Sequence, residues 1–238
     1  MDFVFSPTPV PSVPVHGTPA LFPVRRIFCI GRNYADHAKE SVAMDAKPAA
    51  GAEREPPFFF CKPADAIAPA EEGRVRVPYP PRTQNLQHEV ELVVALGAGG
   101  ADIPTEQAAA CIFGYAIGFD LTRRDLQLLM RDQKKPWEVG KAFDFSAPIS
   151  AITPRAQCGL LTEGAIGCSV NGRQAQTGNL ADMIWPVADI IANLSQYVRL
   201  AAGDLIFTGT PAGVGPIARG DVLEATIAPL GRLTLVVD

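Results

Sequence analysis

Residues 88–96, with the sequence His-Glu-Val-Glu-Leu-Val-Val-Ala-Leu, are the stretch that most restricts how this chain can fold. The run consists largely of β-branched and aliphatic residues and ends at a glycine-rich turn, so it predicts a β-strand. Side chains alternate between the two faces of a strand, which places Glu89 and Glu91 on one side, about 7 Å apart along the backbone. Two carboxylates this close repel each other unless a proton or a cation lies between them.

Two interpretations of the pair stay open when the pair is taken alone. Glu89 and Glu91 are flanked by apolar residues, and a hard divalent ion such as Mg²⁺, which prefers oxygen ligands, would relieve their repulsion. They could equally lie on the solvated face of an edge strand, where water screens their charges. His88 falls on the opposite face, so we expect it to support the strand rather than to act as a base.

The composition excludes several classes of protein. The chain has 238 residues, of which 47% are hydrophobic and 19% are charged, and this is typical of a soluble globular protein with a large core. Its net charge of −4 provides no basic surface for nucleic acid or for an anionic membrane. No apolar run reaches the length that spans a bilayer. We therefore expect neither a nucleic-acid partner nor a membrane partner.

The cysteines predict a reducing compartment. Their number is odd, they are widely spaced, and they form no C-x-x-C pair, so neither a disulfide framework nor a thiolate zinc site is indicated. Most lie in apolar runs and are expected to be buried. The N-terminus lacks the basic segment and apolar core of a signal peptide. A cytoplasmic location follows as the expectation.

The distribution of turn-forming residues predicts a β-rich fold. The 22 prolines and 21 glycines are scattered without a period, which indicates many turns. Residues 1–24 are expected to be an extended segment packed on the body, and residues 25–238 a single catalytic domain. The Asn171-Gly172 pair predicts a tight hairpin turn. Strands are predicted at residues 25–30, 58–61 (buried), 74–77, 115–119, 204–208, 222–228 and 233–237.

Only a few short helices are expected. One is predicted over residues 34–40, and together with the following breaker-rich loop it forms a candidate lid at about 34–57. Thr105 is a plausible N-cap for a helix that reaches about residue 113. Thr122 and Asp125 match the capping-box pattern of a helix that reaches about residue 132. A helix from Pro186 should carry a core-facing stripe of Val187, Ile190, Ile191, Leu194 and Val198.

Further polar residues extend the candidate site. Asp120 ends a predicted strand just before a helix, where functional carboxylates often project, although it could simply cap that helix. His37 and Glu40 lie three residues apart and share a helix face, yet such a pair is usually a surface ion pair. Lys141 could be a lysine at the edge of the core whose stem is buried while its ammonium reaches water.

Six stretches in fixed order resemble the fumarylacetoacetate hydrolase family: residues 31–37, 60–63, 88–92, 118–127, 136–141 and 208–215. In length the chain is similar to the short acylpyruvate hydrolases of that family. The resemblance implies an α+β, β-rich fold, a mixed β-roll or β-sandwich of the family's C-terminal-domain type, and a homodimer.

The resemblance also implies roles for individual residues. Glu89, Glu91 and Asp120 fall on the metal ligands, and oxygen-only ligands fit Mg²⁺ or Mn²⁺. The catalytic dyad falls on His37 and Glu40, and the positions that face the substrate fall on Lys141, Arg124, Gln127 and Thr210. Longer members carry a further aspartate ligand near the position of Ile30, and this chain has none there.

The activity implied by the resemblance is hydrolysis of the carbon–carbon bond of a β-diketo acid. The expected keto-acid substrate is an acylpyruvate, with fumarylpyruvate giving fumarate and pyruvate in gentisate-type aromatic catabolism. Two alternatives on the same scaffold stay open, an oxaloacetate decarboxylase and a 2-hydroxyhepta-2,4-diene-1,7-dioate/5-carboxymethyl-2-hydroxymuconate isomerase, because both also need an enolate held by a metal. A non-catalytic binding protein is the remaining alternative. Loss of a metal carboxylate or of the dyad would favour it, and this chain has lost neither.

Overall fold

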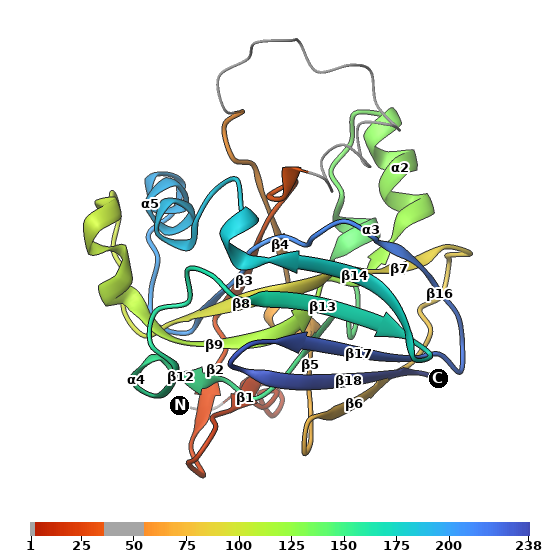
Figure 1. Ribbon diagram of the computed structural model, residues 1–238, viewed down its shortest axis with the longest axis horizontal. Coiled ribbons are helices and arrows are strands. Elements are labelled where there is room, and N and C mark those ends of the chain that lie inside the picture. The colour runs from red at the N-terminus through yellow and green to blue at the C-terminus, as the bar shows by residue number, and fades with distance from the viewer. Residues whose placement is uncertain (1–2, 36–54) are drawn as a thin grey trace.

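The computed structural model describes residues 3–35 and 55–238, and its centre is an eight-stranded sheet (Figure 1). The strands are ordered β4-β3-β15-β8-β9-β11-β5, and β12 pairs with β9. Their bounds are β3 Arg26–Ile30, β4 Phe59–Lys62, β5 Ile67–Pro69, β8 Val90–Leu96, β9 Ile112–Phe119, β11 Ala147–Ile149, β12 Thr153–Pro154 and β15 Asp204–Phe207. The predicted β-rich α+β class is confirmed.

The described residues form three smaller sheets as well. A five-stranded sheet has the order β14-β13-β17-β18-β6, a three-stranded sheet the order β10-β7-β16, and β1 pairs with β2. The bounds are β1 Ser12–Pro14, β2 Leu21–Pro23, β6 Arg74–Val77, β7 Leu86–His88, β10 Thr122–Arg123, β13 Ala165–Val170, β14 Arg173–Asn179, β16 Gly215–Ile217, β17 Val222–Ile227 and β18 Gly231–Val237. Asn171 and Gly172 both have positive φ angles at the β13–β14 turn, so the hairpin prediction is confirmed.

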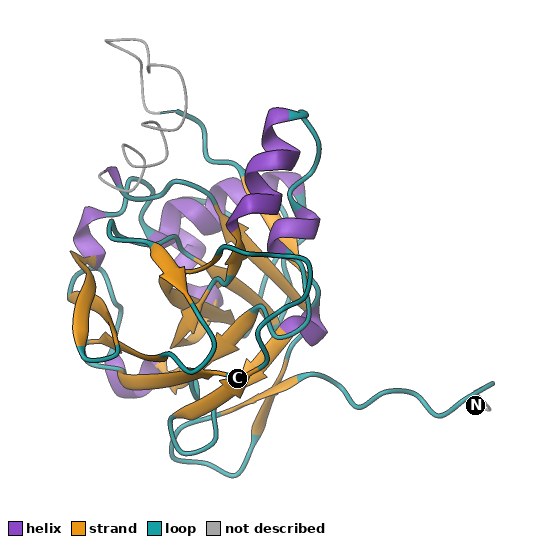
Figure 2. Cartoon of the chain, turned by 90° about the vertical axis from the view of Figure 1, so that its right-hand side faces the viewer, coloured by secondary structure: helices purple, strands orange, loops and turns teal. Residues whose placement is uncertain are grey.

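The helices are short and lie around the sheets (Figure 2). The predicted helix after Pro186 is α5, and four of its five stripe residues are buried, with Val198 packed against the core. The described helices are α2 Arg124–Asp132, α3 Glu138–Lys141, α4 Arg155–Cys158 and α5 Val187–Tyr197, with 3₁₀ turns η1 Ala64–Ala66, η2 Thr105–Cys111 and η3 Leu180–Asp182. Within the described part of the chain, none of them has the length and apolar character needed to cross a membrane.

Strand β8 lies at the centre of the core and is buried on both faces. Val90, Leu92 and Val94 point into the larger apolar cluster, which also contains the inward side chains of β13, β17 and β18. Val93 and Ala95 point into a second cluster with β3, β15 and the β1–β2 hairpin. A strand covered on both faces explains why this run reads as almost continuously apolar.

The prediction of one strand over residues 88–96 is wrong at its start. The chain leaves the strand conformation at Glu89, so β7 and β8 belong to different sheets. β7 pairs with β10 and β16, whereas β8 pairs with β9 and β15. The break places Glu89 at a junction between two sheets, while Glu91 keeps the predicted side of β8.

Both predicted helix caps are also wrong. The segment after Pro104 is a 3₁₀ helix, and no side chain caps it, so Thr105 is not an N-cap. Thr122 belongs to β10, and its hydroxyl donates a hydrogen bond to the carbonyl of Asp120 (3.1 Å). The helix itself exists as α2 but begins at Arg124. Tertiary pairing of β10 with β7 therefore outweighs the local capping pattern.

The predicted buried strand at 58–61 is instead an edge strand. Among the described strands, β4 pairs only with β3, and Phe59 and Phe60 are half-buried while Cys61 is exposed. Three of the five cysteines are buried, as expected for most of them, whereas Cys61 is exposed and Cys158 is partly exposed.

The N-terminal segment lies against the body only in part. Val13, Val15 and Phe22 of the β1–β2 hairpin are buried in the second apolar cluster. Residues 3–10 are exposed, and Figure 2 shows this arm extending away from the sheets. The candidate lid at about 34–57 falls almost entirely outside the described residues.

Candidate active site

The topology gathers five chain segments at one end of the central sheet. β8 begins there beside the end of β9, because the two strands are antiparallel with Val90 opposite Phe119. β15 also runs antiparallel to β8 and ends there, and β3, which is parallel to β15, ends beside it. β4 begins opposite the end of β3. Side chains at these strand ends therefore converge although they are distant in sequence.

The three predicted metal ligands meet at this point. Glu89, Glu91 and Asp120 are 4%, 2% and 1% exposed, and one ligand oxygen from each lies within 4.8 Å of the others. Burial, together with the negative charges of Asp120 and Glu89, raises the pKa of Glu91 well above its usual value. The structure therefore excludes the solvated edge-strand interpretation of the pair.

Glu91 is held by the glycine-rich loop after β15. The Gly209 N–H donates to Oε2 of Glu91 at 2.8 Å. Gly209 has a φ of +91°, and a Cβ at this position would lie 2.7 Å from the Cβ of Asn33, so only glycine fits here. Asn33 fixes the same loop, because its buried amide donates to the carbonyls of Thr208 (2.8 Å) and Trp185 (3.0 Å).

Lys141 projects from the end of α3 into the carboxylate cluster. Its Nζ lies 2.7 Å from Oε2 of Glu89 and 2.6 Å from Oδ2 of Asp120. Burial by itself would lower the pKa of Lys141, but these carboxylates outweigh it, and the pKa lies above its usual value. Lys141 is thus a buried cation of the site and not a lysine whose ammonium reaches solvent.

Arg124 and Gln127 come from the first turns of α2 and contact each other. Arg124 forms an ion pair with Glu89 and donates through Nε to Oε1 of Gln87 (2.7 Å). Its Nη1 donates to Oε1 of Gln127 at 2.5 Å. Because Oε1 of Gln127 accepts this bond, its NH₂ group is the end left to donate to a ligand. Arg124 orients Glu89 and Gln127, and its contact with a substrate stays a prediction.

Thr210 is tied into the fold by its hydroxyl. The hydroxyl donates to the Val90 carbonyl (2.7 Å) and accepts from Nε2 of Gln176 (2.8 Å). Its single hydroxyl proton is therefore already used, and a contact with a substrate carboxylate would fall to the main chain of Thr210. The predicted substrate role of Thr210 stays untested.

Gln176 of β14 fastens the five-stranded sheet to the site. Its Oε1 accepts from the Val90 N–H (3.1 Å) and lies 2.9 Å from Nδ1 of His88, while Nε2 also donates to the Pro211 carbonyl (2.7 Å). His88 must therefore carry its proton on Nδ1. Burial lowers the pKa of His88, and its contact with Gln176 agrees with the expected supporting role.

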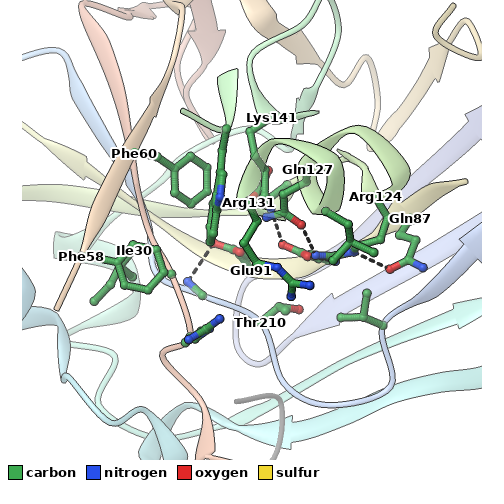
Figure 3. A pocket seen from close by; sticks show the side chains of 18 residues that line it. Ile30, Phe58, Phe60, Gln87, Glu91, Arg124, Gln127, Arg131, Lys141 and Thr210 are labelled. Atoms are coloured by element: carbon green, nitrogen blue, oxygen red, sulfur yellow. Dashed lines mark hydrogen bonds and ion pairs between the residues drawn. The ribbon is translucent and has the colours of Figure 1, made fainter. Parts of the chain in front are cut away.

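The converging side chains enclose a cavity of about 280 Å³ (Figure 3). Ile30, Phe58 and Phe60 lie on one side of it, and Arg124 and Gln87 lie on the other. Trp137 extends the apolar side, with its ring 5.5 Å from that of Phe58. The charged residues that line the cavity are Arg32, Glu89, Glu91, Asp120, Arg124, Arg131 and Lys141.

The donor set fits a hard divalent cation. All three ligands offer carboxylate oxygens, which is the chemistry that Mg²⁺ and Mn²⁺ prefer. Oδ1 of Asp120 is buried and accepts no hydrogen bond from any described residue, although the ammonium of Lys62 lies 2.8 Å away. Oδ1 therefore has a cationic partner but no well-aligned hydrogen bond, and this agrees with an oxygen that also binds an ion.

Sequence reasoning missed the residues that hold the ligands in place. Lys62, Asn33 and Gln176 are fully or almost fully buried and contact the site. Lys62 and Asn33 stand inside two of the six recognised stretches, but local sequence shows no partner for either. Gln176 lies in a hairpin strand, and nothing in the sequence around it indicates a contact with the site. The predicted dyad, His37 and Glu40, lies outside the described residues.

Comparison with known proteins places these features in a family. Residues 26–238 match the fumarylacetoacetate (FAA) hydrolase C-terminal family. A fumarylpyruvate hydrolase of Ralstonia sp is 42% identical over 180 residues, covering 76% of this chain and 92% of the relative. An oxaloacetate tautomerase of Escherichia coli (strain K12) is 39% identical over 206 residues, covering 86% of this chain and 89% of the relative.

A solved structure agrees with the whole fold. The crystal structure of fumarylpyruvate hydrolase from Pseudomonas aeruginosa, in complex with Mn²⁺ and pyruvate, superposes with a TM-score of 0.91 at 46% sequence identity, covering 99% of each chain. Together with the buried carboxylate triad at the end of the central sheet, these matches show that the chain is a member of the fumarylacetoacetate hydrolase family.

Proposed function

We propose that the protein hydrolyses the carbon–carbon bond of an acylpyruvate in a reaction that depends on a divalent metal, with fumarylpyruvate as substrate and fumarate and pyruvate as products. The observation that carries this proposal is the buried triad of Glu89, Glu91 and Asp120, which faces a cavity that also contains Lys141 and Gln127. The Mn²⁺ and pyruvate bound by the Pseudomonas aeruginosa relative support it.

The triad would hold Mg²⁺ or Mn²⁺. When bound, such an ion acts as a Lewis acid that stabilises the negative charge of a departing enolate. The protein's own contribution is to keep the three carboxylates together, through Lys141, Arg124 and the Gly209 N–H. These contacts engage both oxygens of Glu89, Oδ2 of Asp120 and Oε2 of Glu91, so at Glu89 the ion would share an oxygen that already contacts a cation.

Lys141 and Gln127 are suited to stabilise the oxyanion that forms when water adds to the distal ketone. Lys141 uses two of its three N–H groups on Glu89 and Asp120, so a third can reach a substrate oxygen. The NH₂ of Gln127 can donate to the same region. We assign the removal of the water proton to His37, oriented by Glu40, as the family resemblance implies.

The basic side chains of the cavity suit an anionic substrate. Among the described residues, four basic and three acidic side chains line it. Cationic groups in a poorly hydrated site favour ligands that carry negative charge. The aromatic side suits a flat, conjugated acyl chain. Both features agree with fumarylpyruvate.

An enzyme that converts oxaloacetate is the second candidate. The Escherichia coli relative is an oxaloacetate tautomerase, and oxaloacetate is also a dicarboxylate that would fit the same charges. Its smaller carbon chain would leave the aromatic side with Phe58 and Phe60 in poorer contact. For this physical reason we place it second.

A spectrophotometric assay tests the proposal. Purified protein is assayed with fumarylpyruvate and separately with oxaloacetate, each with Mn²⁺, with Mg²⁺ and with excess EDTA. Rapid loss of fumarylpyruvate absorbance that stops with EDTA and yields equimolar pyruvate and fumarate is the expected result. Preference for oxaloacetate with fumarylpyruvate unconverted would overturn the substrate and the reaction while leaving the metal site intact.

We also propose that the protein is a cytoplasmic homodimer. The family resemblance supports the dimer, and five free thiols support a reducing compartment. Light scattering coupled to gel filtration tests the assembly, for which a mass near that of one 25.3 kDa chain would count against it. Fractionation of the source cells tests the location.

A further inference from the structure

Lys62 is a buried cation next to the carboxylate triad that the proposed reaction leaves without a role. It is the last residue of the edge strand β4, and its side chain is 0% exposed, whereas its neighbour Cys61 points to solvent. Burying an ammonium is costly unless the charge is paired and its N–H groups are bonded. The contacts of Lys62 show what compensates for that cost.

The ammonium of Lys62 connects three segments of the site. Its Nζ lies 2.8 Å from Oδ1 of Asp120. It donates hydrogen bonds to the carbonyl of Leu121 at 3.2 Å and to the carbonyl of Lys141. The ring of Phe143 covers it, with its centroid 5.5 Å away. Lys62 therefore fixes the main chain on each side of the cluster and contacts one of its carboxylates.

These contacts of Lys62 also fix the orientation of Lys141. Lys141 ends α3, and the carbonyl that Lys62 holds belongs to the same residue whose Nζ lies between Glu89 and Asp120. The contact with Asp120 is an ion pair, with Nζ of Lys62 2.8 Å from Oδ1. It thus stabilises the negative charge of Asp120 and fixes the direction of its carboxylate.

The charges of the cluster support a role beyond stability. Lys62 pairs with Asp120, Arg124 pairs with Glu89 and Lys141 pairs with both, while the Gly209 N–H holds Glu91. An apolar side chain of similar volume would stabilise a buried position at least as well as an ion pair does. A lysine at this position supplies a positive charge next to Asp120 and fixes the orientations of Asp120 and Lys141.

We propose that Lys62 is a positioning residue. It orients the Asp120 carboxylate for the metal ion and the Lys141 ammonium for the substrate, and it contacts neither the metal ion nor the substrate. This inference rests on the proposed function, since it needs a metal ion at the triad. Outer partners of metal ligands typically change metal affinity by about 10–100-fold when they are removed.

The test compares Lys62→Met, Lys62→Arg and wild type. Mn²⁺ dissociation constants are measured by calorimetry on protein stripped with chelator, and kcat and KM are then measured at saturating Mn²⁺. For Lys62→Met we expect Mn²⁺ to bind about 10-fold more weakly or worse, and kcat to fall by a larger factor than KM rises. Lys62→Arg keeps the charge and the N–H donors, so it should recover part of the Mn²⁺ affinity.

Asp204→Asn is the matched control for stability. Asp204 is also fully buried and ion-paired, with Arg26, but it begins β15 at the end remote from the glycine-rich loop. This variant should lower the melting temperature and keep the wild-type Mn²⁺ dissociation constant. If Lys62→Met binds Mn²⁺ like the wild type, or if Lys62→Arg is no better than Lys62→Met, the inference is overturned. Failure of the wild type itself to bind Mn²⁺ would overturn the proposed metal dependence as well.

Discussion

The ammonium of Lys141 lies 2.6 Å from Oδ2 of Asp120, and both side chains are almost completely buried. The two residues come from the end of α3 and from the end of β9, and they meet beside the two glutamates of the β7–β8 junction. Together with Lys62, which pairs with Asp120 from the other side, they form a buried cluster of two lysines and three carboxylates, and we expect activity and stability to depend on its charge balance.

Lys141→Met should reduce kcat by about 10²–10³-fold, the effect of removing one donor to an oxyanion. It also removes the cation between Glu89 and Asp120, so the metal-free protein should unfold at a lower temperature than the wild type. Steady-state kinetics and melting curves with and without Mn²⁺ test this. Lys135→Met, on an exposed residue, is the control, and equal kcat in both variants would contradict the role of Lys141.

Mn²⁺ binding should weaken as the pH falls from neutral. Burial and the charges of Asp120 and Glu89 raise the pKa of Glu91 in the metal-free protein. The ion binds only the ionised carboxylate, so below that pKa a proton must leave before Mn²⁺ can bind. Calorimetry between about pH 5.5 and pH 8, in buffers of different ionisation enthalpy, measures the affinity and the protons released. A dissociation constant that does not change over this range would contradict competition between a proton and Mn²⁺ for the Glu91 carboxylate.

Gly209→Ala should destabilise the protein by more than Gly220→Ala. Both glycines have positive φ, +91° and +88°, so each alanine pays the same conformational cost of about 1–2 kcal/mol. Only at Gly209 does the new Cβ meet a neighbour, the Cβ of Asn33 at 2.7 Å, whereas nothing lies within 4 Å at Gly220. Urea unfolding measures the difference, and Gly209→Ala alone should also weaken Mn²⁺ binding through Glu91. Equal effects of the two substitutions would show that the loop can move away.

Asp125→Asn should lower stability at neutral pH by about 1 kcal/mol, and the loss should vanish in acid. Partial burial raises the pKa of Asp125, but hydrogen bonds from the Thr83 hydroxyl and the N–H groups of Gln84 and Leu126 outweigh it, so the pKa is lowered. A lowered pKa in the folded state adds stability above the unfolded value of about 3.9, and this is lost as the pH falls through the folded pKa. Urea unfolding of both proteins from pH 7 downward tests this, and a gap that widens in acid would contradict it.

Features that depend on the spacing of apolar residues or on the residue types of a turn could be predicted from the sequence. The alternation of β8 fixed the side of Glu91, the apolar stripe after Pro186 identified α5, and Asn171-Gly172 identified the β13–β14 hairpin. Each of these signals lies within a few residues of the structure it predicts, because side-chain direction and turn geometry are properties of adjacent φ and ψ angles. The three carboxylates were found in this way, with the family resemblance joining them.

Tertiary structure alone decided how the site is held. The break of the strand at Glu89 follows from β7 and β8 pairing in different sheets, and Thr122 joins β10 because β7 is available as a partner. In the local sequence Lys62 is only a lysine at the end of an edge strand. Its partners, Asp120 and the carbonyl of Lys141, come from distant segments that the fold brings next to it. A buried charge is stable only with partners distant in sequence, and no local pattern encodes which partners those are. The sequence by itself therefore determined which groups could bind a metal, and the long-range packing determined which groups orient them.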